Sequence, residues 1–239
     1  MQLPEEVAAI IARIIEQTRP TSIFLYGSRA RDDFLSRSDY EVGVLYENDE
    51  MIEETYLQNM LGPRRRYRIY PYEIDAFTAG SINLPFETSI FIRVVTVGGK
   101  TIWGKPIVEH MSLPPITTVS LLREVKFQLG RASDALACFQ YGYNQLCSRL
   151  FSKSCLWGTR DLVILKLSLF PISYPEIVEA SKNIQLGKYD GIVEKALESR
   201  FSEKVDYDDL LLNVWYLNQL VEKSILDCYK AEGDKVLVS

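Results

Sequence analysis

The segment Ile23–Leu45, which reads IFLYGSRARDDFLSRSDYEVGVL, decides the fold of this chain. Its first four residues form an apolar run that predicts a short buried strand. The run ends at Gly27-Ser28, where a polar and basic stretch begins. A second strand is predicted over Asp39–Leu45, in which two carboxylates alternate with larger side chains. Two strands joined by a polar segment are therefore expected at the centre of the fold.

The carboxylates of the second strand, Asp39 and Glu41, are two residues apart. Residues at i and i+2 project from the same face of a strand, so these side chains should lie side by side. Two adjacent carboxylates repel each other unless a proton or a cation lies between them. Mg²⁺ suits such a pair, because it binds one or two carboxylates together with water and substrate phosphates. The Gly27 backbone and the Ser28 hydroxyl can approach a phosphate closely. The segment predicts a site for a metal-bound nucleoside triphosphate.

The order Gly27-Ser28, ten residues, then Asp39-Tyr40-Glu41-Val42 resembles the signature of the DNA polymerase β-like nucleotidyltransferase superfamily. The sequence Gly-Ser-Arg-Ala-Arg is most similar to that of the minimal and the aminoglycoside nucleotidyltransferases. The resemblance extends to Lys100–Gly104, whose sequence is similar to the end of a minimal nucleotidyltransferase domain. Asp32 departs from the pattern, because the superfamily more often has glycine there.

The resemblance implies transfer of a nucleoside monophosphate, with AMP from ATP as the default, to an acceptor hydroxyl. It implies two Mg²⁺ ions held by Asp39, Glu41 and a third carboxylate on a neighbouring strand. Asp75 is the best match for that third acid, as metal ligand and as the base that accepts the hydroxyl proton, and Glu73 is the alternative. Both lie in residues 69–77, which predict a third strand, at an edge or bulged because it contains a proline.

The same resemblance assigns the phosphate contacts to the polar turn. The Gly27 backbone and the Ser28 hydroxyl would contact the terminal phosphates, and Arg29 or Arg31 would neutralise the charge that develops on them. The basic run Arg64–Arg68 has two interpretations. It could contact the triphosphate or an anionic acceptor, but a solvated strand edge is the favoured interpretation, because no glycine turn accompanies the run.

Composition sets the broad class of the protein. The chain has 239 residues, of which 47% are hydrophobic and 25% charged, as is ordinary for a soluble globular protein. Its net charge of −5 argues against general nucleic-acid binding. No apolar run is long enough for a membrane span, and the acidic N-terminal segment does not resemble a signal peptide. The four cysteines lack metal-site spacing, so reduced thiols in a cytoplasmic protein are expected.

The expected fold class is α+β, with a small mixed sheet followed by an all-α bundle. The predicted domains are 1–108, a nucleotidyltransferase domain, and 116–230, the helical bundle, with a flexible tail over 231–239. Helices are expected at 4–18, 49–61 and 86–97. A proline-rich linker at 105–117 contains the sole histidine, His110, which is more plausible there as a structural or solvated residue than as a ligand. Beyond it, helices are expected at 118–150, 158–170, 174–185, 189–200 and 206–229.

Several alternatives stay open at this level. The acceptor could be a small alcohol, a protein hydroxyl or an RNA end, and the apolar helix faces fit either one core or a homodimer interface. Glu124 and Asp134 are weak candidates for an acceptor-side base, since each is more simply a solvated helix acid. A catalytically silent nucleotide-binding or antitoxin-like module is the second functional hypothesis. A HEPN-type ribonuclease is excluded because the helical region has no histidine, and a template-directed polymerase is weaker because the chain is short and acidic.

Overall fold

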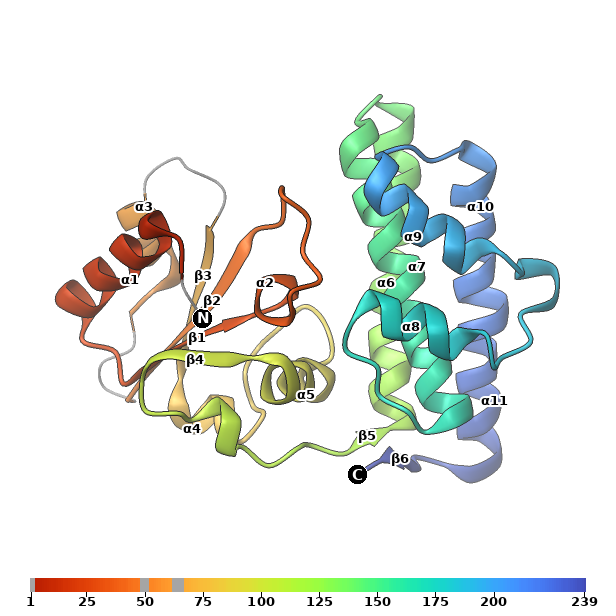
Figure 1. Cartoon of the computed structure of the whole chain (residues 1–239). Coiled ribbons are helices and arrows are strands. Elements are labelled where there is room, and N and C mark those ends of the chain that lie inside the picture. The colour runs from red at the N-terminus through yellow and green to blue at the C-terminus, as the bar shows by residue number, and fades with distance from the viewer. Residues whose placement is uncertain (1–2, 48–51, 62–66) are drawn as a thin grey trace. The chain divides into compact units, whose positions relative to one another are not determined.

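The computed structural model describes residues 3–47, 52–61 and 67–239 (Figure 1). The chain forms two compact units. One comprises residues 1–83 and 91–113, and the other comprises residues 84–90 and 114–239. The limits predicted from the sequence differ from these units chiefly at residues 84–90, which group with the helices that follow.

The first unit is built on a four-stranded sheet. Its strand order is β3-β2-β1-β4, with β1 antiparallel to both neighbours and β2 parallel to β3. The strands are β1 (Ser22–Tyr26), β2 (Tyr40–Tyr46), β3 (Tyr67–Glu73) and β4 (Lys100–Gly104). The mixed sheet and the helices around it confirm the predicted α+β class. Pro71 lies in β3, which is an edge strand as a proline requires.

Helices cover both faces of this sheet (Figure 1). On one face, α1 (Glu5–Thr18) and α3 (Glu54–Leu61) pack on alternate strand residues, in a core that includes Ile14, Val44 and Leu57. The predicted N-cap of α3, Asp49, lies outside the described residues. On the other face, α4 (Ile74–Thr78) and α5 (Thr88–Gly98) contribute Phe77 and Phe91 to an aromatic cluster with β1 and β3.

The prediction of a continuous strand over 69–77 is wrong beyond Glu73. The chain turns there into α4, because the Glu73 carboxylate caps that helix by accepting hydrogen bonds from the Asp75 and Ala76 amides, each at 3.1 Å. Such a cap satisfies amides that lack an intrahelical partner. Asp75 is consequently an exposed residue in the first turn of a helix.

The second unit is mainly helical, as predicted. Its long elements are α6 (Thr118–Gln140), α7 (Asn144–Leu167), α8 (Tyr174–Ser181), α9 (Ile192–Ser202), α10 (Tyr207–Trp215), the π-helical segment η4 (Tyr216–Glu222) and α11 (Lys223–Glu232). Short 3-10 turns occur at η2 (Val108–His110) in the first unit and η3 (Gly187–Tyr189) in the second. The four cysteines are free thiols, and Cys147 and Cys155 are buried. No helix of the described residues is both long and apolar enough to cross a membrane.

Two glycines correct the predicted limits of the first long helices. A helix from 118 to about 150 was expected, but α6 ends at Gln140 and Gly142 has a positive φ of 74°. The next helix, α7, then continues through Gly158, where a new helix was expected to begin. A Cβ on Gly158 would overlap the Leu217 side chain, so this glycine lets a helix segment pack closely against α7.

The C-terminal segment was predicted to fray, but it contains a strand. β6 (Val236–Val238) pairs antiparallel with β5 (Ile116–Thr117), and the Thr118 amide donates to the Lys235 carbonyl at 3.0 Å. This small sheet joins the end of the chain to the start of α6.

Candidate functional site

The site begins at the turn after β1. Gly27 has φ 73° and ψ −161°, a conformation that side chains other than glycine's rarely adopt. A Cβ at this position would also overlap the Glu41 carboxylate. Ser28 then opens the short helix α2 (Ser28–Arg31). The glycine is therefore required both by the backbone turn and by the position of an acidic side chain above it.

The carboxylate pair lies at the beginning of β2. Asp39 immediately precedes the strand, and Glu41 is paired in register with Tyr26 of β1 on one side and Arg68 of β3 on the other. Strand alternation puts Asp39 on the same face as Glu41, and it puts both on the face of the aromatic cluster. The structure thus brings together Gly27, Asp39 and Glu41, three of the predicted site residues.

Arg68 also lies beside the pair, although a solvated strand edge was the favoured interpretation of the basic run Arg64–Arg68 that contains it. Its Nε donates to Asp39 Oδ2 at 2.9 Å, with the two side chains 48% and 26% exposed. A hydrogen bond with Tyr70 raises the pKa of Arg68, partial burial lowers it, and the bond with Asp39 raises it again. The guanidinium is therefore a permanent positive charge beside the pair. The rest of the basic run, residues 64–66, lies outside the described residues.

Neither candidate for the third carboxylate lies beside the pair. In the parallel register Glu41 is opposite Arg68, whereas Glu73 is opposite Tyr46. Five strand residues separate these positions, which corresponds to about 16 Å along the strand. Asp75 lies still further on, in α4, and Glu73 is engaged as the helix cap. The third-acid role predicted for Asp75 has no support in this register.

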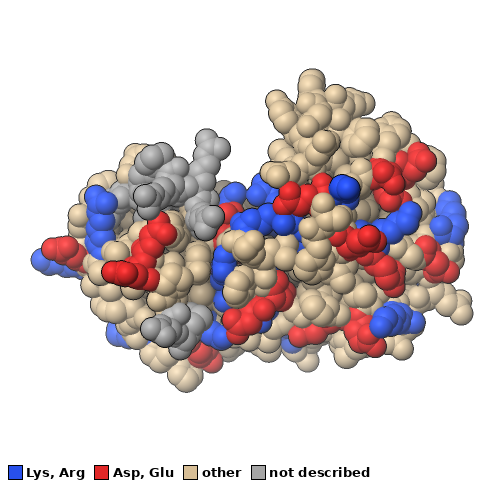
Figure 2. All heavy atoms as spheres, turned by 45° about the horizontal axis from the view of Figure 1, so that its top comes forward, with Lys and Arg blue, Asp and Glu red and all other residues tan. Residues whose placement is uncertain are grey.

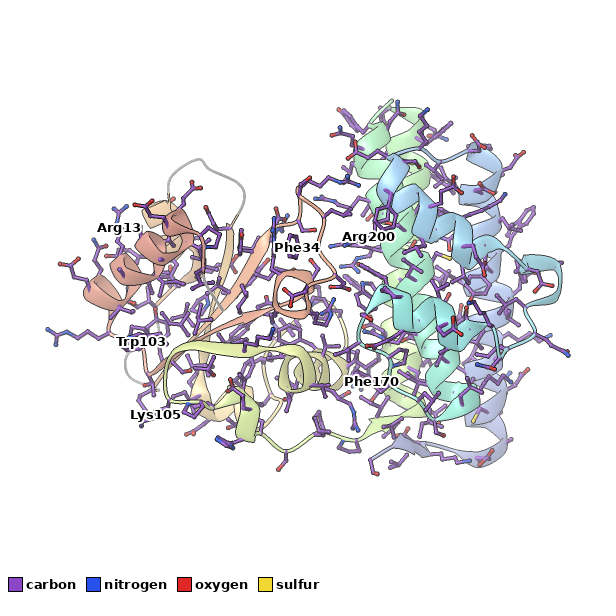
Figure 3. All side chains as sticks on the ribbon, in the orientation of Figure 1. Arg13, Phe34, Trp103, Lys105, Phe170 and Arg200 are labelled. Carbon is purple, nitrogen blue, oxygen red and sulfur yellow. The ribbon has the colours of Figure 1, made fainter. Side chains whose placement is uncertain are left out.

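Arg29 holds the loop that leads to Asp39. Its Nε and Nη2 donate to the Ser38 carbonyl at 3.2 and 3.0 Å, and its guanidinium lies over the rings of Phe34 and Tyr40. Phe34 projects from this loop after α2 (Figure 3). Charge-assisted bonds to the backbone fix the segment immediately before the carboxylate pair.

Arg31 and the residue after it also stabilise the turn. Arg31 is almost buried and lies 3.4 Å from Asp33 in an ion pair. Asp32 ends α2 in the left-handed conformation, with φ 64°, a conformation that glycine adopts without strain. Both arginines that the resemblance assigned to phosphate thus have partners within the loop.

The floor of the site is aromatic. Tyr26, beside Glu41, packs edge-on against Phe91 with ring centroids 5.5 Å apart, and Phe24 packs over Gly43. Burial raises the pKa of the Tyr26 phenol well above its ordinary value, and the nearby Tyr72 and Glu41 raise it further. Tyr26 is therefore a neutral hydrogen-bonding group next to the acidic pair at physiological pH.

The residues present suit one divalent cation better than two. Asp39 and Glu41 offer hard oxygen ligands on one face, and Glu41 rests on a glycine that leaves room for it. The third acid of a two-ion site is not beside them. Within the described segments, no group of three or more histidine, cysteine, aspartate or glutamate side chains is arranged to hold a metal ion.

Three other residues that the sequence singled out have surroundings of their own. His110 lines a cavity of about 630 Å³ together with Lys105 and Met111, away from the carboxylate pair in the fold of the first unit. Glu124 is buried, contrary to the solvated acid that was expected, and accepts bonds from Arg160 at 3.2 Å and Gln128 at 2.7 Å. Asp134 is exposed on α6.

Comparison with known proteins shows the fold of this chain. No family model and no curated protein sequence matches it. A crystal structure of spectinomycin adenyltransferase AAD(9) from Enterococcus faecialis with ATP and spectinomycin matches with a TM-score of 0.57. The match covers 92% of this chain and 97% of the other, at 11% sequence identity. This chain has the adenyltransferase's fold. The fold implied by the sequence resemblance is thereby confirmed.

Proposed function

We propose that this chain is a nucleotidyltransferase that transfers a nucleoside monophosphate, by default AMP from ATP, to an acceptor hydroxyl. The observation that carries the proposal is the Asp39–Glu41 pair, which lies on one face of β2 against the Gly27 turn. The shared fold supports it, because the similar adenyltransferase was crystallised with ATP and a small hydroxyl-bearing molecule. A small-molecule acceptor is accordingly the first class to test.

In the proposed reaction the acceptor oxygen attacks the α-phosphorus and forms a new phosphate ester. The bond from that phosphorus to the β-phosphate oxygen breaks, pyrophosphate leaves, and the hydroxyl proton of the acceptor passes to a water molecule of the solvent. The Gly27 backbone and the Ser28 hydroxyl would contact the terminal phosphates. Asp39 and Glu41 would hold Mg²⁺, which neutralises phosphate charge when bound. The protein contributes mainly orientation and fixed charge.

The test is pyrophosphate release from ATP and Mg²⁺ in the presence of a panel of hydroxyl acceptors that includes spectinomycin. Asp39→Asn should reduce release by about 100-fold or more, because it removes a carboxylate ligand of the Mg²⁺ ion that would neutralise the charge of the reacting phosphates. Asp75→Asn is the matched control, since this acid lies beyond the far end of β3, in α4, and it should retain activity. Equal loss in both variants would contradict the arrangement proposed here.

A second candidate function is a nucleotide-binding module without turnover. It is favoured by one observation, the arginine that occupies the strand position beside the pair. Calorimetric titration with a non-hydrolysable ATP analogue, together with the pyrophosphate assay, distinguishes this module from a nucleotidyltransferase. Binding that depends on Mg²⁺ and Asp39, without pyrophosphate release for any acceptor, supports the module. Turnover with any acceptor rules it out, and absence of binding contradicts both.

A further inference from the structure

Arg68 occupies a distinctive place in the sheet. Cross-strand neighbours on one face are about 5 Å apart, and the parallel register makes Arg68 the neighbour of Glu41 on β3. Its Nε is also 2.9 Å from Asp39 Oδ2. One basic side chain therefore contacts one acid of the pair and adjoins the other, at the strand position where a third acid would be close enough to share a metal ion.

The charge of the site follows from this placement. Asp39 and Glu41 contribute two negative charges and Arg68 one positive charge, so the three together carry −1. Before a nucleotide binds, one divalent cation overcompensates that charge, and a second would meet strong repulsion from the first cation and the guanidinium. A bound triphosphate adds negative charge, but Arg68 offers no oxygen ligand to hold a second ion beside the pair. Three carboxylates, by contrast, would carry −3 and would accommodate two divalent cations.

Arg68 also has the chemistry to bind phosphate. A guanidinium presents a planar fork of donors that matches two phosphate oxygens. The Arg68 side chain is 48% exposed, so part of its donor surface is accessible beyond the bond to Asp39. Its neighbours on β3, Tyr67 and Ile69, are buried and fix the strand that carries it.

We propose that Arg68 is a built-in cation of this site, so that the chain binds a nucleoside triphosphate with one divalent ion instead of two. This inference rests on the proposed function and adds to it the number of ions and a phosphate-binding residue. Asp39 and Glu41 would share the single ion, and Arg68 would face the triphosphate from β3.

The first test counts the ions. Electron paramagnetic resonance of free Mn²⁺ gives the number of ions bound per chain when a non-hydrolysable ATP analogue is present in an amount equal to the chain, at concentrations at which all of the analogue is bound to protein. Wild type should bind one ion, and Arg68→Glu should bind two, because the exchange restores a third acid. Arg13→Glu, an equal change of charge on the exposed face of α1 (Figure 3), should still bind one. Two ions in wild type would overturn the proposal.

The second test needs no nucleotide and uses a milder variant. Arg68→Gln removes the competing cation while keeping a long polar side chain on a half-exposed strand position. Its affinity for Mn²⁺ alone should rise by about tenfold, the effect of removing one nearby positive charge. Unchanged affinity in Arg68→Gln would refute Arg68 as the cation of the pair. Failure of the ATP analogue to bind any variant would instead refute the proposed function, and the Mn²⁺ titration would still report on Arg68.

Discussion

Gly27 shows how one residue can serve both the backbone and a site. Its φ of 73° with ψ −161° belongs to a region used almost only by glycine. The Glu41 carboxylate occupies the space where a Cβ would stand. The sequence pointed to this glycine through its place in the motif, but the contact with Glu41 required the antiparallel pairing of β1 with β2.

We expect Gly27→Ala to lower the free energy of unfolding by about 1–3 kcal/mol, because the backbone is strained and Glu41 is displaced. Urea unfolding measures the loss. Gly80→Ala is the matched control, since Gly80 also has a positive φ, of 67°, but a Cβ there meets nothing within 4 Å. The control should lose less of its free energy of unfolding than Gly27→Ala does. Equal losses would mean that the contact with Glu41 is of no consequence.

Asp161 is a buried acid that the proposed reaction does not use. It lies in α7, is fully buried, and neither carboxylate oxygen has a hydrogen-bond partner among the described residues. Arg160 Nε is 3.7 Å from its Oδ1, and Arg160 also pairs with the buried Glu124. Burial raises the pKa of Asp161 well above its ordinary value; Arg160 lowers it, and Glu124 raises it further.

This raised pKa predicts a pH-dependent stability. The contribution of Asp161 to the free energy of unfolding is fully present below the pKa of an aspartate in the unfolded chain. It is lost as the pH rises through the raised pKa of the folded state. Asp161→Asn should therefore be more stable than wild type at about pH 8, by about 1–3 kcal/mol, and similar to it at low pH. Urea unfolding across this range tests it, with the exposed Asp134→Asn as control. A variant less stable than wild type at high pH would contradict the prediction.

At the scale of elements, local caps decided where strands and helices end. The apolar and polar alternation of residues 69–77 suits a strand, but the Glu73 carboxylate accepts hydrogen bonds from the Asp75 and Ala76 amides and so begins α4. The prediction of one helix over 118–150 is wrong for a related reason. Gly142, which has a positive φ, separates α6 from α7. The residues at which these elements end depend on side-chain hydrogen bonds, which the periodicity of apolar residues does not reveal.

The pairing of β5 with β6 gives an element-level prediction. The Val119 amide donates to Asp234 Oδ1 at 3.0 Å, and the Thr118 amide donates to the Lys235 carbonyl. These two hydrogen bonds give partners to amides in the first turn of α6, which have none within the helix. Removing residues 233–239 should lower the free energy of unfolding by about 1–3 kcal/mol in thermal or urea denaturation. Asp234→Ala should show only part of that loss, and an unchanged truncated chain would contradict the role of β6.

At the scale of the whole molecule, two separate hydrophobic cores account for the two units. One core joins α1 and α3 to a face of the mixed sheet, and the other lies among α6 to α11. The surface carries both signs of charge, and on the face drawn in Figure 2 basic side chains lie among acidic ones. With a net charge of −5, the triphosphate binding that we propose would depend on local groups such as Arg68 and not on the charge of the whole chain.

The sequence by itself determined the α+β class, the two central strands and the position of the acidic pair. Alternation and motif spacing are local properties, so Ile23–Leu45 alone sufficed to identify the two central strands, the glycine turn, and Asp39 and Glu41. The helical character of the second unit followed in the same way from its apolar periodicity.

Only the tertiary structure decided which residue stands beside the pair. From the sequence alone, either Asp75 or Arg68 could lie beside Asp39. The parallel register of β2 with β3 decides which of the two does. A shift of that register moves every side chain along the neighbouring strand, and no short-range pattern in the sequence specifies it. Because charge interactions act through space, the single cation that we propose for the site is argued from that register and from the Arg68–Asp39 bond.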